Sequence, residues 1–269
     1  MKSFAEKLLE ASKKNQSLLC IGLDPDPDLM PIDDVFEFNR AIIEATSDIV
    51  CAYKPNIGFY EAMGPRGLDA LMKTRECIPP NIPIIIDAKR GDTMPTAKFY
   101  AKSLFETLGF DAATVNPYLG YDSLAPFLDY ADKGVFILCK TSNPGAKELQ
   151  DLVIGEKKLR LYEWVATKAS LWNENNNIGL VVGATYPDEI RNVRTLCPEM
   201  PLLIPGIGPQ HGALALSVRN GVDSNGHKAI INSSRQVLYA SKNRKDFDEA
   251  ARAQALSLRG EINAALADR

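Results

Sequence analysis

Two carboxylates and a lysine occur within six positions in the segment Asp87-Ala88-Lys89-Arg90-Gly91-Asp92. The residues before it are apolar and mostly β-branched, which is typical of a buried strand. Side chains alternate between the faces of a strand, so Asp87 and Lys89 are predicted to share one face. Gly91 is expected to let the backbone turn freely, so that Asp92 leaves the strand. This cluster could be a solvated group of salt bridges or a set of catalytic charges.

The elements that must position these charges follow a regular alternation. Strand-like apolar runs occupy residues 18–24, 52–56, 84–89, 112–116, 135–141, 178–184, 202–207 and 229–233. Segments with helical periodicity lie between them, among them residues 35–50, 96–108, 159–172 and 210–219. Alternating strands and helices indicate parallel βαβ units, and eight such units close a TIM (β/α)8 barrel. The sequence therefore predicts one barrel domain over residues 1–269 with a short amphipathic N-terminal helix. A doubly wound open sheet is the structural alternative.

Polar residues collect where the predicted strands end. Asp24, Lys54 and Asn116 each stand directly before or after a proline, and a Thr-Ser-Asn-Pro-Gly run covers residues 141–145. In a barrel, all strand ends meet on the C-terminal face, where the active sites of this fold are built. This clustering favours a functional site over scattered surface charge.

A phosphate site is predicted after the seventh and eighth strands. The run Pro205-Gly206-Ile207-Gly208-Pro209-Gln210 leads into a helix, and glycines let backbone N–H groups approach an anion. TIM barrels often bind phosphate with these two loops, and Arg235 could provide a bidentate cationic clamp. A purely structural turn is the alternative for the glycine-containing run.

Composition narrows the class of protein. The formal net charge of −3 argues against nucleic-acid or membrane-surface partners. The five cysteines include no C-x-x-C pair, which indicates reduced thiols and a cytoplasmic setting. No apolar run approaches the ~20 residues of a membrane span. With only two histidines, a histidine-based metal site is not expected.

Over nearly its whole length the chain resembles the orotidine 5′-phosphate decarboxylase family, in its longer bacterial form. The most specific element is the D-x-K-x-x-D signature of residues 87–92. Further similarity lies in Tyr53-Lys54-Pro55-Asn56, in the run around Ser142, in the segment from Pro205 to Gln210, and in Asn232-Ser233-Ser234-Arg235.

The resemblance implies a homodimer that uses neither cofactor nor metal. Lys54, Asp87 and Lys89 are then expected to act with Asp92 from the other subunit. The substrate-binding residues that it implies are Asp24 and Thr96 at the ribose, Ser142 at the pyrimidine, and Pro205, Gly206, Gly208, Gln210, Ser234 and Arg235 at the phosphate. Structural roles remain open for several of them, such as helix capping by Asp24 or Thr96 and turn formation by Ser142.

The implied reaction removes CO2 from orotidine 5′-phosphate and leaves a carbanion at C6 of the ring. The expected roles are proton donation by Lys89, repulsion of the leaving carboxylate by Asp87, and an electrostatic setting made by Lys54 and Asp92.

Two other functions remain open from the residues. One is a metal-dependent sugar-phosphate decarboxylase or epimerase on the same barrel, in which a similar D-x-K-x-x-D strand helps bind Mg²⁺. The other is a catalytically silent barrel that binds nucleotides or a partner protein.

Overall fold

Eight parallel strands form the centre of the protein. The computed structural model describes residues 2–206 and 211–268. The strands are β1 (Leu19–Leu23), β2 (Ala52–Pro55), β3 (Ile85–Arg90), β4 (Ala112–Val115), β5 (Gly134–Lys140), β8 (Ile178–Val182), β9 (Leu202–Pro205) and β10 (Ala229–Ser233). Their order in the sheet is β2-β1-β10-β9-β8-β5-β4-β3, and each neighbouring pair is parallel.

The two ends of this sheet meet between β2 and β3. Isolated parallel bridges join Tyr53 to Ile84 and Asn56 to Asp87, and the Tyr53 N–H donates to the Pro83 carbonyl at 3.1 Å. The sheet is therefore a nearly closed barrel, which confirms the predicted TIM fold over the open sheet.

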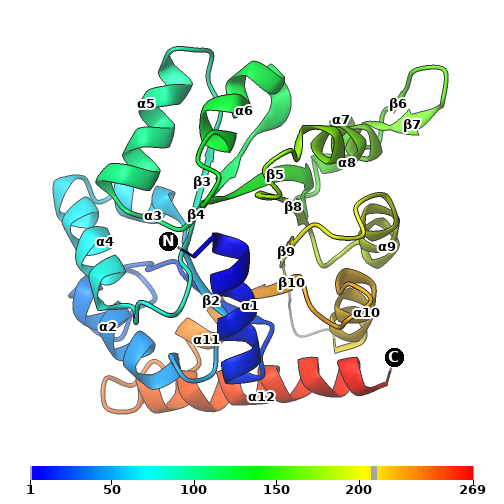
Figure 1. Ribbon diagram of the computed structural model, residues 1–269. Coiled ribbons are helices and arrows are strands. Elements are labelled where there is room, and N and C mark those ends of the chain that lie inside the picture. The colour runs from blue at the N-terminus through cyan, green and yellow to red at the C-terminus, as the bar shows by residue number, and fades with distance from the viewer. Residues whose placement is uncertain (1, 207–210, 269) are drawn as a thin grey trace.

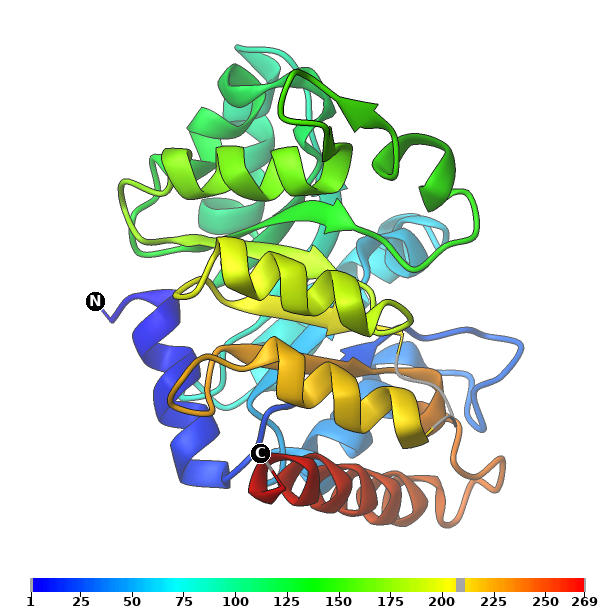
Figure 2. The same ribbon diagram turned by 90° about the vertical axis from the view of Figure 1, so that its right-hand side faces the viewer.

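Helices surround the barrel (Figures 1 and 2). The longer ones are α2 (Val35–Thr46), α4 (Pro65–Cys77), α5 (Thr96–Lys102), α6 (Tyr121–Leu128), α8 (Leu161–Trp172), α9 (Pro187–Leu196), α10 (His211–Gly221) and α12 (Phe247–Ala267). Short helices α3 (Ile57–Glu61), α7 (Ala146–Gln150) and α11 (Arg235–Leu238) lie in the connections after β2, β5 and β10.

Three of the predicted helices differ from the structure in part of their length. The helix expected over residues 35–50 ends at Thr46. The helix expected over residues 96–108 is α-helical only to Lys102 and continues as a π-helix, Ser103–Thr107. The helix expected over residues 159–172 begins at Leu161, because Leu159–Arg160 forms strand β7, which pairs with β6 (Val153–Ile154). This hairpin projects from the barrel at the upper right of Figure 1.

The core has two layers that follow from strand alternation. Cys20, Ile85 and Phe136 belong to the cluster inside the barrel. Their neighbours, such as Ile21 and Ile86, belong to the larger cluster between the barrel and its helices. Inward-facing positions near the C-terminal strand ends therefore carry the side chains that line the barrel mouth.

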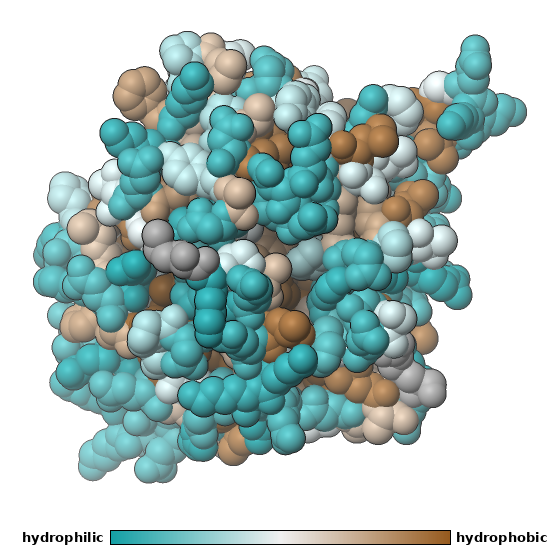
Figure 3. Space-filling view, in the orientation of Figure 1, coloured by the Kyte–Doolittle hydropathy of each residue, from teal (hydrophilic) through white to brown (hydrophobic). Residues whose placement is uncertain are grey.

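Helix α1 (Phe4–Asn15) closes the opposite end of the barrel, where the strands begin (Figures 1 and 2). Phe4 and Leu8 join the interior cluster, and the Phe4 ring meets Phe136 edge to face at 5.5 Å. The ring of Phe4 fits because Gly134 has no side chain; a Cβ there would lie 2.6 Å from it. The helix expected to lie on the surface thus plugs the barrel, while the face that it presents is mostly hydrophilic (Figure 3).

The five cysteines are free thiols, as predicted. Four of them are buried, and Cys77 is partly exposed. Across residues 2–206 and 211–268, no helix has the length and apolar character needed to cross a membrane.

The plug predicts a stability effect that is separate from activity. Replacement of Phe4 by alanine should lower the free energy of unfolding by about 3 kcal/mol, because it leaves a cavity against Phe136 and Gly134. Chemical denaturation measures this loss. Leu9→Ala is the control, since this side chain of the same helix is 38% exposed, and it should cost less than about 1 kcal/mol. Equal losses for the two variants would contradict the plug.

Candidate functional site

A cavity of about 570 Å³ opens at the C-terminal ends of the strands. Its size is typical of a site for a small molecule. It is lined by Asp24, Lys54, Asn56, Phe59, Asp87, Pro205, Gly206, Asn232, Ser233, Ser234, Arg235 and Gln236.

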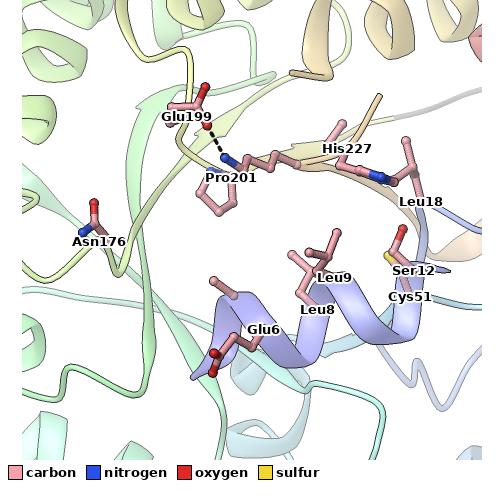
Figure 4. Close-up of a pocket in the computed structure, with 13 residues that line it drawn as sticks. Glu6, Leu8, Leu9, Ser12, Leu18, Cys51, Asn176, Glu199, Pro201 and His227 are labelled. Carbon is pink, nitrogen blue, oxygen red and sulfur yellow. Dashed lines mark hydrogen bonds and ion pairs between the residues drawn. The ribbon is translucent and has the colours of Figure 1, made fainter. Parts of the chain in front are cut away.

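A second cavity, of about 450 Å³, lies at the other end of the barrel beneath α1 (Figure 4). Its walls include Leu8 and Leu9 of α1, and Glu199 pairs with Lys228 at one side. The residues that line it do not include Lys54 or the charged residues Asp87, Lys89 and Asp92. The cavity at the strand ends is therefore the candidate functional site.

Asp87 and Lys54 line this cavity, Lys89 is not among its lining residues, and Asp87 is the centre of the charged group that the three form. Lys54 Nζ lies 3.2 Å from Asp87 Oδ2, and Lys89 Nζ lies 2.7 Å from Oδ1. The hydroxyl of Thr114 also donates to Oδ1 at 2.8 Å, and Asn56 Nδ2 lies 3.5 Å from Oδ2. Both carboxylate oxygens thus face donors from three different strands and the end of β2.

Burial and neighbouring charges have opposite effects on the pKa values of Asp87 and Lys54. Burial by itself would raise the pKa of Asp87, but the ammonium groups of Lys54 and Lys89 and the hydrogen bonds outweigh it and lower the pKa to about 2. Burial would likewise lower the pKa of Lys54, yet Asp87 and Asp24 raise that pKa above its ordinary value. Both groups are therefore ionised at neutral pH.

Lys89 departs from the regular strand that its neighbours predict. Its φ angle is 46°, a left-handed conformation that is uncommon for a lysine, and the β3–β4 register shifts between Ile86 and Arg90. The Lys89 N–H donates to the hydroxyl of Thr114 at 2.9 Å, which holds this conformation. Lys89 and Asp87 do meet, but through a bulge and not through simple alternation.

Gly91 serves a different purpose from the one expected. Its φ is not positive, whereas a Cβ at this position would lie 2.8 Å from the Asn116 carbonyl. Glycine is thus required by the close approach of two backbones. Next to it, Arg90 pairs with Glu61 and lies over the ring of Tyr100, which ties the end of β3 to α3 and α5.

Asp92 and Thr96 do not line the cavity of their own chain. Asp92 accepts a hydrogen bond from the Thr93 N–H at 2.7 Å, and within the described ranges it forms no ion pair with Lys54 or Lys89. Thr96 is exposed and begins α5, whose capping position is occupied by Pro95, so Thr96 is not the cap.

Residues of the predicted phosphate end line the same cavity as Asp87. Gly206, with a φ of 91°, and Ser234 and Arg235 all line it, and the Arg235 side chain is exposed. A Cβ on Gly22 would lie 1.9 Å from Ser234 Oγ and 3.0 Å from Asp24 Oδ2, so these two oxygens flank one bare stretch of β1. The predicted residues Gly208 and Gln210 lie outside the described residues.

Ser142 is not among the residues that line the cavity, but it lies next to Gly206, which does line it. Its Oγ would be 3.5 Å from a Cβ built on Gly206. Just before it, the Thr141 N–H donates to Gln150 at 2.8 Å, and the buried Lys140 pairs with Asp151 at 2.5 Å. These contacts hold the connection between β5 and α7 that carries Ser142.

Thr114 is the contact that sequence reasoning missed. It is 1% exposed and lies in β4 between alanine and valine. Because Ala112 faces the barrel interior, Thr114 two residues later faces it as well. A lone hydroxyl at an inward position near a strand end was the available signal.

No described group of three or more histidine, cysteine or acidic side chains is placed to hold a metal ion. At Asp87, the oxygens that a cation would need already accept from Lys54, Lys89 and Thr114.

Comparisons with known proteins agree with this architecture. The model of the orotidine 5′-phosphate decarboxylase / HUMPS family matches residues 17–250. An orotidine 5′-phosphate decarboxylase of Thermomicrobium roseum is 51% identical over 267 residues, covering 97% of this chain and 95% of the relative. One from Dehalococcoides mccartyi is 52% identical over 264 residues and covers 97% of each chain. The solved OMP decarboxylase of Leishmania donovani superposes with a TM-score of 0.88 at 42% identity over 98% of each chain.

The lowered pKa of Asp87 predicts acid-dependent stability. Since its folded pKa lies below the ordinary value of about 3.9, ionised Asp87 stabilises the fold above pH ~4, and this contribution of about 2 kcal/mol is lost as the pH falls toward ~2. Unfolding free energies across this range should therefore fall more steeply in the wild type than in Asp87→Asn. Asp69→Asn, which removes an exposed carboxylate paired with Lys73, should follow the wild type. Parallel curves for wild type and Asp87→Asn would count against the lowered pKa.

Proposed function

The chain belongs to the orotidine 5′-phosphate decarboxylase / HUMPS family and is a carboxy-lyase that decarboxylates orotidine 5′-phosphate in pyrimidine nucleotide synthesis, and we propose that the Asp87 cluster performs the chemistry. The observation that carries this proposal is one carboxylate that lines the cavity at the strand ends and is held between two ammonium groups.

The chemical difficulty is the electron pair left on C6 when the bond to the carboxyl group breaks. No carbonyl is placed to delocalise this pair, so fixed charges must stabilise it. Lys54, Asp87 and Lys89 together carry one net positive charge, which suits a site that receives an anionic carboxylate. Asp92 of a second subunit would make the group formally neutral and limit the cost of its burial.

Asp87 raises the energy of the bound substrate before the reaction. Its low pKa keeps it ionised when a substrate carboxylate arrives. Two like charges ~4 Å apart at an effective dielectric of ~20 repel by about 4 kcal/mol, and this repulsion disappears as CO2 leaves. Enzymes commonly lower barriers by about 8–23 kcal/mol, so further stabilisation must come from contacts that strengthen in the transition state.

Lys89 supplies that contact and the proton. Its ammonium is held by Asp87 at 2.7 Å, yet its side chain is 47% exposed, in contrast to Lys54 at 4%. Lys89 can therefore reach a bound ligand without leaving its partner. The C6–carboxyl bond breaks, the electron pair remains on C6, and a Lys89 N–H proton then bonds to C6 and leaves a neutral amine.

The remaining residues orient the nucleotide. Arg235, Ser234, Gly206 and Pro205 line one side of the cavity and would hold the phosphate, with Gly208 and Gln210. Asp24, beside Ser234, would bind the ribose together with Thr96. Ser142, beside Gly206, would contact the pyrimidine.

The surface around Asp92 supports assembly into a homodimer. Phe99 is 72% exposed and Tyr118 is 83% exposed, and contiguous exposed apolar surface commonly marks an interface. The exposed large apolar residues of this region are Met94, Phe99, Tyr100, Tyr118, Leu119 and Tyr121. A second copy docked here would bring Asp92 and Thr96 toward the neighbouring cavity.

Loss of the proton donor should separate turnover from binding. Lys89→Ala is expected to abolish decarboxylation, which is measured as the decrease in the ultraviolet absorbance of orotidine 5′-phosphate. Binding of uridine 5′-monophosphate should remain largely intact, because the phosphate and ribose contacts persist. Lys73→Ala, which removes an exposed lysine on α4, should retain wild-type turnover. Near-normal turnover by Lys89→Ala would remove Lys89 as the donor.

A shared site predicts complementation between inactive subunits. Mixtures of Lys89→Ala and Asp92→Ala chains should regain activity, because one of the two sites in a mixed dimer then carries both residues. Exchange is verified by mass measurement of differently tagged chains. If the subunits exchange and no activity returns, Asp92 does not act across the interface.

A further inference from the structure

Unpartnered buried polar atoms concentrate at one wall of the active-site cavity. Among the described residues, five buried side-chain atoms lack a hydrogen-bond partner, and three of them belong to Asn232, Ser233 and Gln236. All three residues line the cavity. A buried acceptor without a donor is costly, so such a cluster marks a place where a ligand supplies the donor.

Asn232 is buried, and its side chain faces the interior of the barrel. Ile230 of β10 belongs to the interior cluster and Ile231 to the outer one, so Asn232 faces inward again. Its side chain lies among apolar residues at its own level, since β1 pairs it with Cys20. The residue is 5% exposed, and the only hydrogen bond of its side chain within the described residues is a long one of 3.5 Å from Nδ2 to Ser234 Oγ.

The neighbours of Asn232 indicate which part of the nucleotide supplies the donor. Asp24 Oδ2 and Ser234 Oγ both lie next to Gly22, and the side-chain amide of Asn232 lies within 3.5 Å of the same Ser234 hydroxyl. A phosphate offers only acceptors near neutral pH and cannot satisfy Oδ1 of Asn232. The vicinal hydroxyls of a ribose are donors, and they connect the phosphate end at Arg235 to the base end at Ser142.

We propose that Asn232 accepts a hydrogen bond from a ribose hydroxyl and thereby makes the enzyme selective for ribonucleotides. This inference rests on the proposed placement of the nucleotide in the cavity. A site that buries an acceptor for a hydroxyl rejects the analogue that lacks this hydroxyl, because the acceptor is then left unpaired.

The experiment compares three ligands on two proteins by titration calorimetry. The ligands are uridine 5′-monophosphate and its 2′-deoxy and 3′-deoxy analogues, and the proteins are wild type and Asn232→Leu, which keeps a similar volume. Wild type should prefer the ribonucleotide over one of the deoxy analogues by about 10-fold or more. In Asn232→Leu this preference should shrink by about 5-fold or more, to what the other ribose contacts provide, while the affinity for that deoxy analogue changes by less than about 3-fold.

Two controls keep the outcomes distinct. Asn263→Leu makes the same substitution on α12, away from this cavity, and should keep the wild-type preference. Asn232→Ala provides the same comparison if the leucine variant fails to fold. An unchanged preference in the Asn232 variants overturns the inference alone, whereas failure of wild type to bind uridine 5′-monophosphate overturns the placement of the nucleotide on which it rests.

Discussion

The buried ion pair between Lys54 and Asp87 is the interaction on which the rest of the structure depends. A lysine that is 4% exposed is stable as a cation only beside a fixed anion, and Asp87 stays ionised only because cations and donors surround it. Neither residue can be placed without the other. The barrel makes this possible because adjacent strands bring two distant parts of the chain to the same level at its open end.

The other contacts of the site follow from that pair. Thr114 donates to Asp87 and accepts from the backbone of Lys89, so one hydroxyl fixes both the anion and the strained turn that carries the second ammonium. Strained backbone persists where surrounding contacts over-determine it, and such strain clusters at functional sites. Phe4 plugs the end of the barrel where the strands begin. The cavity at the C-terminal ends of the strands is therefore the place where charged side chains can meet a ligand.

Much of this organisation could be predicted from the sequence. The eight strands follow from apolar runs at regular spacing, and the polar residues at their ends predict which side chains meet. The left-handed Lys89 could not be predicted, because lysine has no preference for that conformation and the cause is Thr114, which is distant in sequence. Strand β7 of the β6–β7 hairpin could not be predicted either, because its two residues begin a segment with helical periodicity. Asp92 stays a prediction, since its expected partners belong to a second chain.

The seam of the barrel has a consequence for the evolution and engineering of the enzyme. Strands β2 and β3 are joined by isolated bridges, and the Lys54–Asp87 pair spans this same junction. The charges that are proposed to act on the substrate therefore also hold the most weakly paired strands together. Under this proposal, selection for faster turnover and selection for heat resistance act on the same pair of residues, and a thermostable variant must gain its extra stability elsewhere in the molecule.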